Sequence, residues 1–165
     1  MPDVPSRAAF GVPAEMGLLT KPWAAIKLLV LYLEYWIVGL GEEWFHVSKG
    51  NLLFDLERYS AAAGAYSRAL QESKSPLLQA RLGWCYMRMN MPNSAVDLLT
   101  TVRSHSGRPE VGMTLLHALI QAGKLPEASV LHGDLMKTVP ESSNEMRADL
   151  SELGALLKEA GASRS

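Results

Sequence analysis

Apolar and small residues recur along the middle of the chain at a fixed interval of 33 positions. Ala62, Ala95 and Ala128 are spaced by this interval, and so are Gly50 and Gly83. A constant period of this length is typical of a solenoid, in which repeated units stack because no single unit can bury its own apolar face. The pattern therefore predicts three structural repeats in the middle of the chain.

Each repeat is predicted to contain two helices. In the third copy, residues 115–122 form an apolar helical run that ends at Gly123, a residue suited to the position just after a helix. The second helix begins near Pro126, which suits a first helical turn, and extends to Pro140. Ala128 and its equivalents fall early in the second helices, where two helices cross closely and require a small residue.

The positions of the apolar, glycine and alanine residues resemble the consensus of the tetratricopeptide (TPR) repeat. The matching residues are Gly50, Leu53, Leu56, Tyr59, Ala62, Tyr66 and Ala69 in the first copy, Leu82, Gly83, Tyr86, Met89 and Ala95 in the second, and Leu115, Leu116, Leu119, Gly123, Leu125, Ala128 and Pro140 in the third. Each copy is one residue shorter than the family period of about 34. Lys49 also departs from the pattern, because it stands where the first copy should be apolar. The resemblance implies an all-α solenoid of about three TPR-type helical hairpins over residues 43–141.

Residues 142–160 are predicted to form a capping helix, followed by a tail at 161–165. Ser142 and Glu145 have the spacing of a capping box at the start of a helix. One apolar stripe follows, made of Met146, Leu150, Leu153 and Leu157. A solenoid needs such a last element, because its terminal repeat would otherwise expose the core.

An apolar segment at residues 22–41 precedes the repeats and follows an N-terminal tail at 1–21. It contains only two charged residues, Lys27 and Glu34, and its length matches a membrane span. Trp23 at one end and Trp44 beyond the other resemble the aromatic belts of the two membrane interfaces. We therefore predict a single transmembrane helix, with a buried or interface helix packed onto the solenoid as the alternative.

Glu34 makes this predicted span marginal in lipid. An acid near the middle of a span costs about 2.5–3.5 kcal/mol, which offsets much of the gain from the aliphatic residues. Lys27 lies on the same helical face as Glu34. We expect these two residues to make an intramembrane contact with a protein neighbour, since polar groups within membranes usually face protein.

The charges that flank the segment predict its orientation. Arg7 and Lys21 precede it, whereas Glu42 and Glu43 follow it. The positive-inside tendency then places the N-terminus in the cytoplasm and the repeats on the opposite side of the membrane.

The composition argues against several other classes of protein. The net charge is −1 and no basic stripe is present, so we predict no nucleic-acid partner. The chain has one cysteine, Cys85, which precludes an internal disulfide and is predicted to be buried. The four histidines lack the spacing of a metal site, and no phosphate-binding or nucleophile motif occurs. We therefore predict neither an enzyme nor a cofactor.

The TPR resemblance implies that the first helix of each repeat lines a concave groove for a partner. The groove residues carried over from the family are Trp44, Asn51, Phe54, Trp84, Met87, Arg88, Met113, His117 and Ile120. Asn51 matches one position of the carboxylate clamp that chaperone-binding TPR domains use, but Val47, Ala80 and Trp84 do not supply the others. The expected ligand is therefore an apolar peptide or helix rather than an acidic C-terminus.

Two functions follow from these features. The first is a membrane-anchored adaptor that serves as a subunit or as an assembly or stabilisation factor of a membrane protein complex, with integral membrane subunits as partners. The alternative is a soluble TPR scaffold or co-chaperone whose apolar N-terminal helix packs internally.

Overall fold

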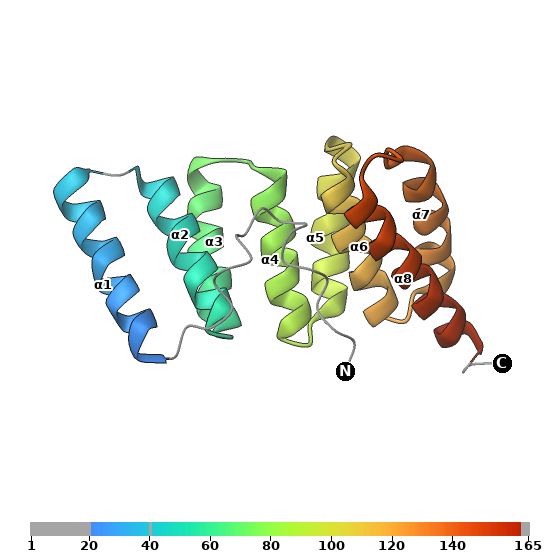
Figure 1. The fold of residues 1–165 in the computed structure, drawn as a ribbon, viewed down its shortest axis with the longest axis horizontal. Helices are drawn as coiled ribbons and strands as arrows, with labels where there is room; N and C mark the ends of the chain where they lie inside the picture. The colour runs from blue at the N-terminus through green and yellow to red at the C-terminus, as the bar shows by residue number, and fades with distance from the viewer. Residues whose placement is uncertain (1–20, 40, 163–165) are drawn as a thin grey trace.

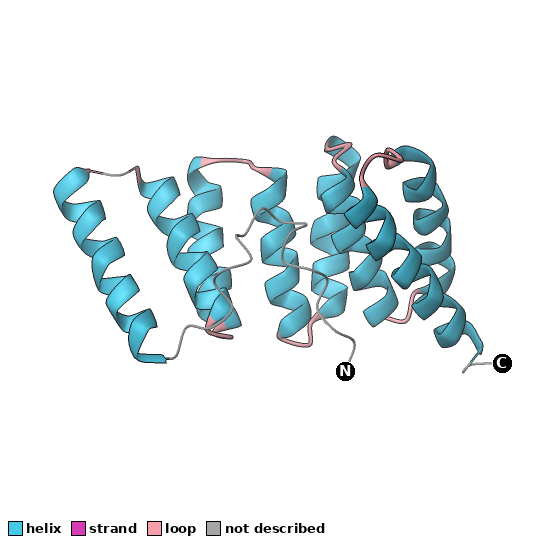
Figure 2. Cartoon of the chain, viewed as in Figure 1, coloured by secondary structure: helices cyan, strands magenta, loops and turns pink. Residues whose placement is uncertain are grey.

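The chain is a row of antiparallel helices, seen in a computed structural model that describes residues 21–39 and 41–162 (Figure 1). Within these ranges the chain forms eight α-helices and no strand (Figure 2). The helices are α1 (Lys21–Val38), α2 (Glu42–Asp55), α3 (Tyr59–Glu72), α4 (Pro76–Arg88), α5 (Pro92–His105), α6 (Pro109–Gln121), α7 (Leu125–Thr138) and α8 (Asn144–Ala162). The predicted tail at 1–21 lies outside the described residues except for Lys21, and residues 163–165 of the C-terminal tail lie outside them too.

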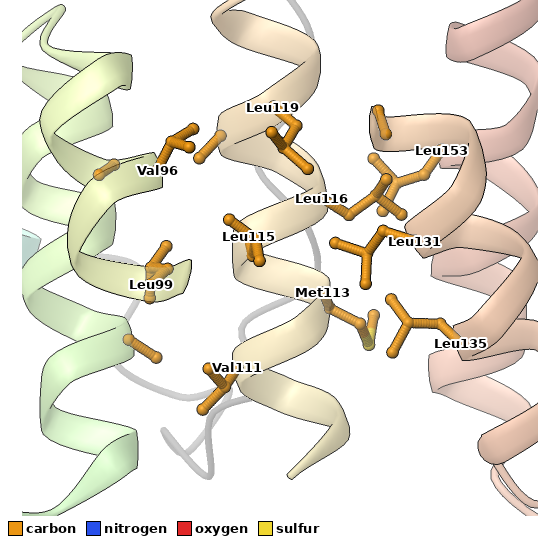
Figure 3. Packing of buried hydrophobic residues seen from close by; sticks show 14 of the residues in the cluster. Val96, Leu99, Val111, Met113, Leu115, Leu116, Leu119, Leu131, Leu135 and Leu153 are labelled. Atoms are coloured by element: carbon orange, nitrogen blue, oxygen red, sulfur yellow. The ribbon is translucent and has the colours of Figure 1, made fainter. Parts of the chain in front are cut away.

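Helices α2 to α7 form three successive hairpins, which confirms the predicted all-α, TPR-like solenoid. The three alanines at the repeat period are fully buried in α3, α5 and α7, as the helix crossings require. Figure 3 shows that α6 packs between two neighbouring helices. Leu115 lies on the side of α6 that faces Leu99 of α5, and Leu116 lies on the side that faces Leu131 of α7. The buried residues form two clusters, one over α2–α4 and one over α4–α8, and α4 contributes to both.

The same turn closes all three hairpins. Glu57, Asn90 and Gly123, spaced at the repeat period, have positive φ values of 60°, 61° and 74°. After Gly123, the backbone N–H of Lys124 donates to the carbonyl of Leu119 at 2.9 Å. This is the six-to-one hydrogen bond of a Schellman motif, and matching bonds follow Glu57 and Asn90.

Helix α8 covers the last hairpin. Its residues Leu150, Leu153 and Leu157 are buried, as the predicted apolar stripe requires. Nε2 of His132 in α7 lies 2.8 Å from the carbonyl oxygen of Leu150, which ties the two helices together. The first helical hydrogen bond runs to the carbonyl of Ser143, so Ser143 rather than Ser142 occupies the cap position.

The predicted membrane span over residues 22–41 is not supported. Helix α1 ends at Val38, and Gly39 follows with a positive φ of 66°. Over the described ranges, none of the helices combines the length and the apolarity needed to cross a membrane. The physical reason is that the 18 residues of α1 include three charges, those of Lys21, Lys27 and Glu34. The predicted orientation across a membrane loses its basis with the span.

Helix α1 instead folds back along α2 (Figure 1). Leu31 and Phe45 are buried at this contact, and the ring centroids of Tyr32 and Phe45 lie 5.0 Å apart. Nζ of Lys49 donates to the Tyr32 hydroxyl at 2.6 Å, which explains the polar residue at this repeat position. Among the described residues, one face of α1 packs on α2 and the opposite face is exposed, so α1 is an interface helix packed onto the solenoid, as the alternative prediction allows.

Candidate protein-binding surface

The first helices of the hairpins carry one row of equivalent residues. Asn51 of α2, Trp84 of α4 and His117 of α6 are spaced at the repeat period of 33 residues. The ring centroids of Trp84 and His117 lie 5.0 Å apart with an interplanar angle of 54°. Asn51 is joined to α4 by a hydrogen bond from Nη1 of Arg81 to its side-chain oxygen. The structure thus brings three predicted groove residues into one row, called here the Asn51–Trp84–His117 row.

The Trp84–His117 pair forms an aromatic, uncharged part of this row. Both side chains are half-buried, and Trp84 also packs against the core. Burial lowers the pKa of His117 to about 4, so the imidazole is neutral at physiological pH. Within the described chain, no hydrogen-bond partner lies near its buried Nε2 atom. The pair can therefore offer stacking and apolar contact to a ligand rather than charge.

The Asn51 end of the row is polar, and its hydrogen bonds connect helices of the fold. Its side-chain oxygen accepts from the Tyr66 hydroxyl at 2.8 Å in addition to the Arg81 guanidinium. In a carboxylate clamp the corresponding asparagine would bind the ligand. Here the side-chain oxygen of Asn51 instead links α2, α3 and α4. Arg81 and Tyr66 were not among the predicted site residues, because no sequence pattern marks a hydrogen bond between separate helices.

The remaining predicted groove residues occupy different environments. Met87 and Met113 are buried in the core, so they are not on the surface. Ile120 and Phe54 are half-buried, and the Phe54 ring lies 5.2 Å from that of Tyr59. Trp44 is exposed in the first turn of α2, on the same helix as Asn51.

Arg88 borders this surface at the end of α4. It is exposed, its Nη2 donates to the Tyr59 hydroxyl at 2.8 Å, and its guanidinium carbon lies 5.0 Å from the centre of the Tyr59 ring. Gln121, one repeat later, donates from Nε2 to the carbonyl of Met87 at 3.2 Å. Both side chains brace neighbouring helices and supply a polar border to the apolar pair.

The two predicted intramembrane residues, Lys27 and Glu34, lie on α1, which packs against α2, the helix that carries Asn51. Both are exposed, and neither lies on a spanning helix.

Across residues 21–39 and 41–162, no cluster of three or more His, Cys, Asp or Glu side chains could hold a metal ion. Cys85 is fully buried, and burial raises the pKa of its thiol to about 12. The thiol is therefore protonated at neutral pH and packs as a small apolar group.

Comparison with known proteins identifies the fold. No protein-family model matches the sequence, and no curated protein sequence matches it either. The solved NMR structure of the first TPR domain of the human RPAP3 protein is similar, with a TM-score of 0.62 and 18% sequence identity. The similarity covers 74% of this chain and 99% of that domain. The chain therefore has the fold of a TPR domain.

Proposed function

We propose that the protein is a non-enzymatic interaction scaffold that binds an apolar peptide or helix of a partner protein along the Asn51–Trp84–His117 row. The observation that carries this proposal is the half-buried Trp84–His117 ring pair, at equivalent positions of adjacent repeats and 5.0 Å apart. Tryptophan is among the residues most enriched in binding hot spots, because it supplies a large contact area at a low cost in conformational entropy.

The chemistry of the row favours an apolar ligand. His117 is neutral at physiological pH because burial lowers its pKa to about 4. Arg88 and Gln121 provide a polar border, an arrangement typical of interfaces with an apolar centre and a polar rim. The partner that we propose is a segment of another protein.

A peptide-display experiment tests the proposal. Random peptides displayed on phage would be panned against the full chain, and the selected peptides would be measured by fluorescence anisotropy. Apolar peptides should be selected, and Trp84→Ala should weaken their binding by roughly 30-fold or more, since a hot-spot truncation costs about 2 kcal/mol or more. Val130→Ala is the matched control, because Val130 is exposed on α7 and lies outside the row.

Two outcomes would contradict the proposal. Selected peptides that bind equally well to the Trp84→Ala and His117→Ala variants would place the binding site elsewhere. Selection of peptides whose binding depends on a free C-terminal carboxylate would instead indicate a clamp built from other residues. Circular dichroism of each variant separates loss of binding from loss of the helical fold.

A further inference from the structure

The face of α1 that points away from α2 is unusually apolar for a surface. Seven large apolar side chains on it are between 45% and 83% exposed. They are Trp23, Ile26, Leu29, Val30, Leu33, Trp36 and Ile37. Tyr32 is also exposed but lies on the side of α1 that contacts Lys49. We call these seven residues the outer face of α1.

The size of the outer face is that of an interaction surface. A tryptophan side chain alone offers about 150–250 Å², so seven large side chains at these exposures leave several hundred Å² uncovered. A contiguous apolar patch of this size is at the upper limit for a monomer and usually marks a binding site. It approaches the roughly 800 Å² that each partner contributes to a stable interface of standard size.

We propose that the outer face of α1 binds the same face of a second copy of the chain, with the two α1 helices antiparallel about a two-fold axis. Charge complementarity favours a second copy over other occupants. Lys27 and Glu34 are both exposed and lie seven residues apart, hence on one flank of the outer face. In an antiparallel helix pair, the same flanks of the two helices meet. Lys27 then lies opposite Glu34 of the partner subunit, and the two-fold axis creates this pair twice.

The apolar positions fit the same register. Ile26, Val30, Leu33 and Ile37 follow the alternating four- and three-residue spacing of a coiled-coil seam. With Lys27 opposite Glu34 of the partner subunit, Val30 packs beside Leu33 of the partner subunit. Ile26 packs beside Ile37 of the partner subunit. A parallel pair would not bring Lys27 and Glu34 together, because each flank would then face the opposite flank of the other helix. One antiparallel register therefore satisfies both the charges and the seam.

The position of α1 allows this association. It lies at the end of the row of helices opposite to α8, and its far side faces no other described helix (Figure 1). Two copies joined through α1 would form one longer solenoid. The Asn51–Trp84–His117 row of each copy would remain uncovered. The dimer therefore does not compete with the proposed peptide site.

The first test is the oligomeric state of the full chain. Sedimentation equilibrium should show a monomer–dimer equilibrium for the wild type. Leu33→Glu should weaken dimerisation by roughly tenfold or more, since it places two like charges in an apolar seam. Val130→Glu, an equally drastic change at an exposed position on α7, should leave the dimer intact. Circular dichroism should show that both variants keep their helices.

Charge reversal tests the register. Lys27→Glu and Glu34→Lys should each weaken the homodimer by roughly tenfold, because both symmetric pairs become like-charged. The double variant Lys27→Glu/Glu34→Lys should dimerise as the wild type does, since it exchanges the charges within each pair. An equimolar mixture of the two single variants should form a heterodimer that is tighter than either homodimer.

Other occupants of the outer face would give different results. A wild-type chain that stays monomeric at all concentrations overturns the proposal. If that monomer also floats with phosphatidylcholine vesicles and Leu33→Glu abolishes flotation, the face binds lipid. If deletion of residues 1–20 converts the monomer to a dimer, that segment covers the face. Failure of the double variant to restore the wild-type dimer overturns the antiparallel register.

Discussion

The ring of Tyr66 packs directly against the backbone of Gly50, so that a Cβ atom at position 50 would lie 2.5 Å from Cε1 of the ring. Leu99 packs against Gly83 in the same way one repeat later, with its Cδ1 atom 2.8 Å from such a Cβ. The two glycines at the repeat period thus let the first and second helices of a hairpin approach closely. In the third repeat, Leu116 takes the glycine position and His132 turns toward α8.

Gly50→Ala should therefore destabilise the protein, although alanine has the higher helix propensity. Overpacking against the buried Tyr66 ring costs about 1–3 kcal/mol, more than the roughly 1 kcal/mol gained from propensity. Gly64→Ala is the control, because a Cβ there meets nothing within 4 Å and the same substitution should stabilise α3. Urea denaturation of both variants measures the difference. An equal gain in stability at both positions would contradict the close approach of α2 and α3.

The hairpin turns provide a second test. Glu57 and Asn90 adopt positive φ values of 60° and 61°, which Gly123 adopts at the equivalent position of the third repeat. A left-handed conformation costs a residue with a Cβ about 1 kcal/mol, and asparagine tolerates it better than glutamate. Glu57→Gly should therefore raise the free energy of unfolding by up to about 1 kcal/mol, and Asn90→Gly by less. Gly123→Ala should lower it. Thermal melting of the three variants provides the comparison.

Ala95 tests the crossing of α4 and α5. It is fully buried, so Ala95→Leu should destabilise by about 1–3 kcal/mol through overpacking. Ala61→Leu is a matched control on α3, because Ala61 is exposed and leucine also forms helices well. A neutral effect of Ala95→Leu on the melting temperature would be inconsistent with the repeat register.

The repeat period predicted most of the fold but only part of the surface. Ala62, Ala95 and Ala128 could be placed from sequence because a helix crossing admits only small residues. The sequence does not show which of Trp84 and Met87 turns into the core and which lies on the surface. They lie three positions apart on one helix, and a shift of one helical position decides which of them turns into the core. Offsets taken from a family cannot resolve that choice, because it depends on how each hairpin rotates against the next.

The sequence left two placements open for the N-terminal helix, a membrane span and a helix packed onto the solenoid. Composition alone identifies an apolar helix around residues 22–41, but both a membrane and a protein surface accept such a helix. The features that decide between these two placements are the turn after α1 and a contact across that turn. Gly39 reverses the chain, and Lys49 donates to the Tyr32 hydroxyl. Lys49 is an exception to the repeat consensus that only its partner on α1 explains.

His117 should make stability depend on pH. Its pKa is lowered to about 4 in the folded protein, while the unfolded chain has the ordinary value near 6.5. Between these two values the unfolded chain binds a proton that the folded protein does not, so stability falls as the pH decreases from 6.5 to about 4. The loss is of the order of a few kcal/mol at the lower end of this range.

His117→Leu should remove this part of the pH dependence. Leucine leaves no polar atom without a partner, so the variant should be at least as stable as the wild type at low pH. Urea denaturation of both proteins across this pH range gives the two profiles. His46, whose pKa is also lowered by burial, contributes the same slope to both proteins and cancels in the difference. If the stabilities of the two proteins changed in parallel with pH, His117 would be accessible to protons in the folded state.

The last prediction concerns the attachment of α1. Nζ of Lys49 lies 2.6 Å from the Tyr32 hydroxyl and 5.1 Å from the centre of the Tyr32 ring, so it binds α1 by both a hydrogen bond and cation–π attraction. Lys49→Met keeps the aliphatic stem but removes the ammonium group. The loss should be about 0.5–1.5 kcal/mol, since the site is partly exposed. Amides of α1 should then exchange with solvent several-fold faster, while those of α6 should be unchanged because they lie in separate layers. Lys74→Met, at an exposed lysine outside this contact, is the control for loss of charge. Equal exchange rates in α1 for both variants would mean that Leu31 and the aromatic rings alone hold the helix in place.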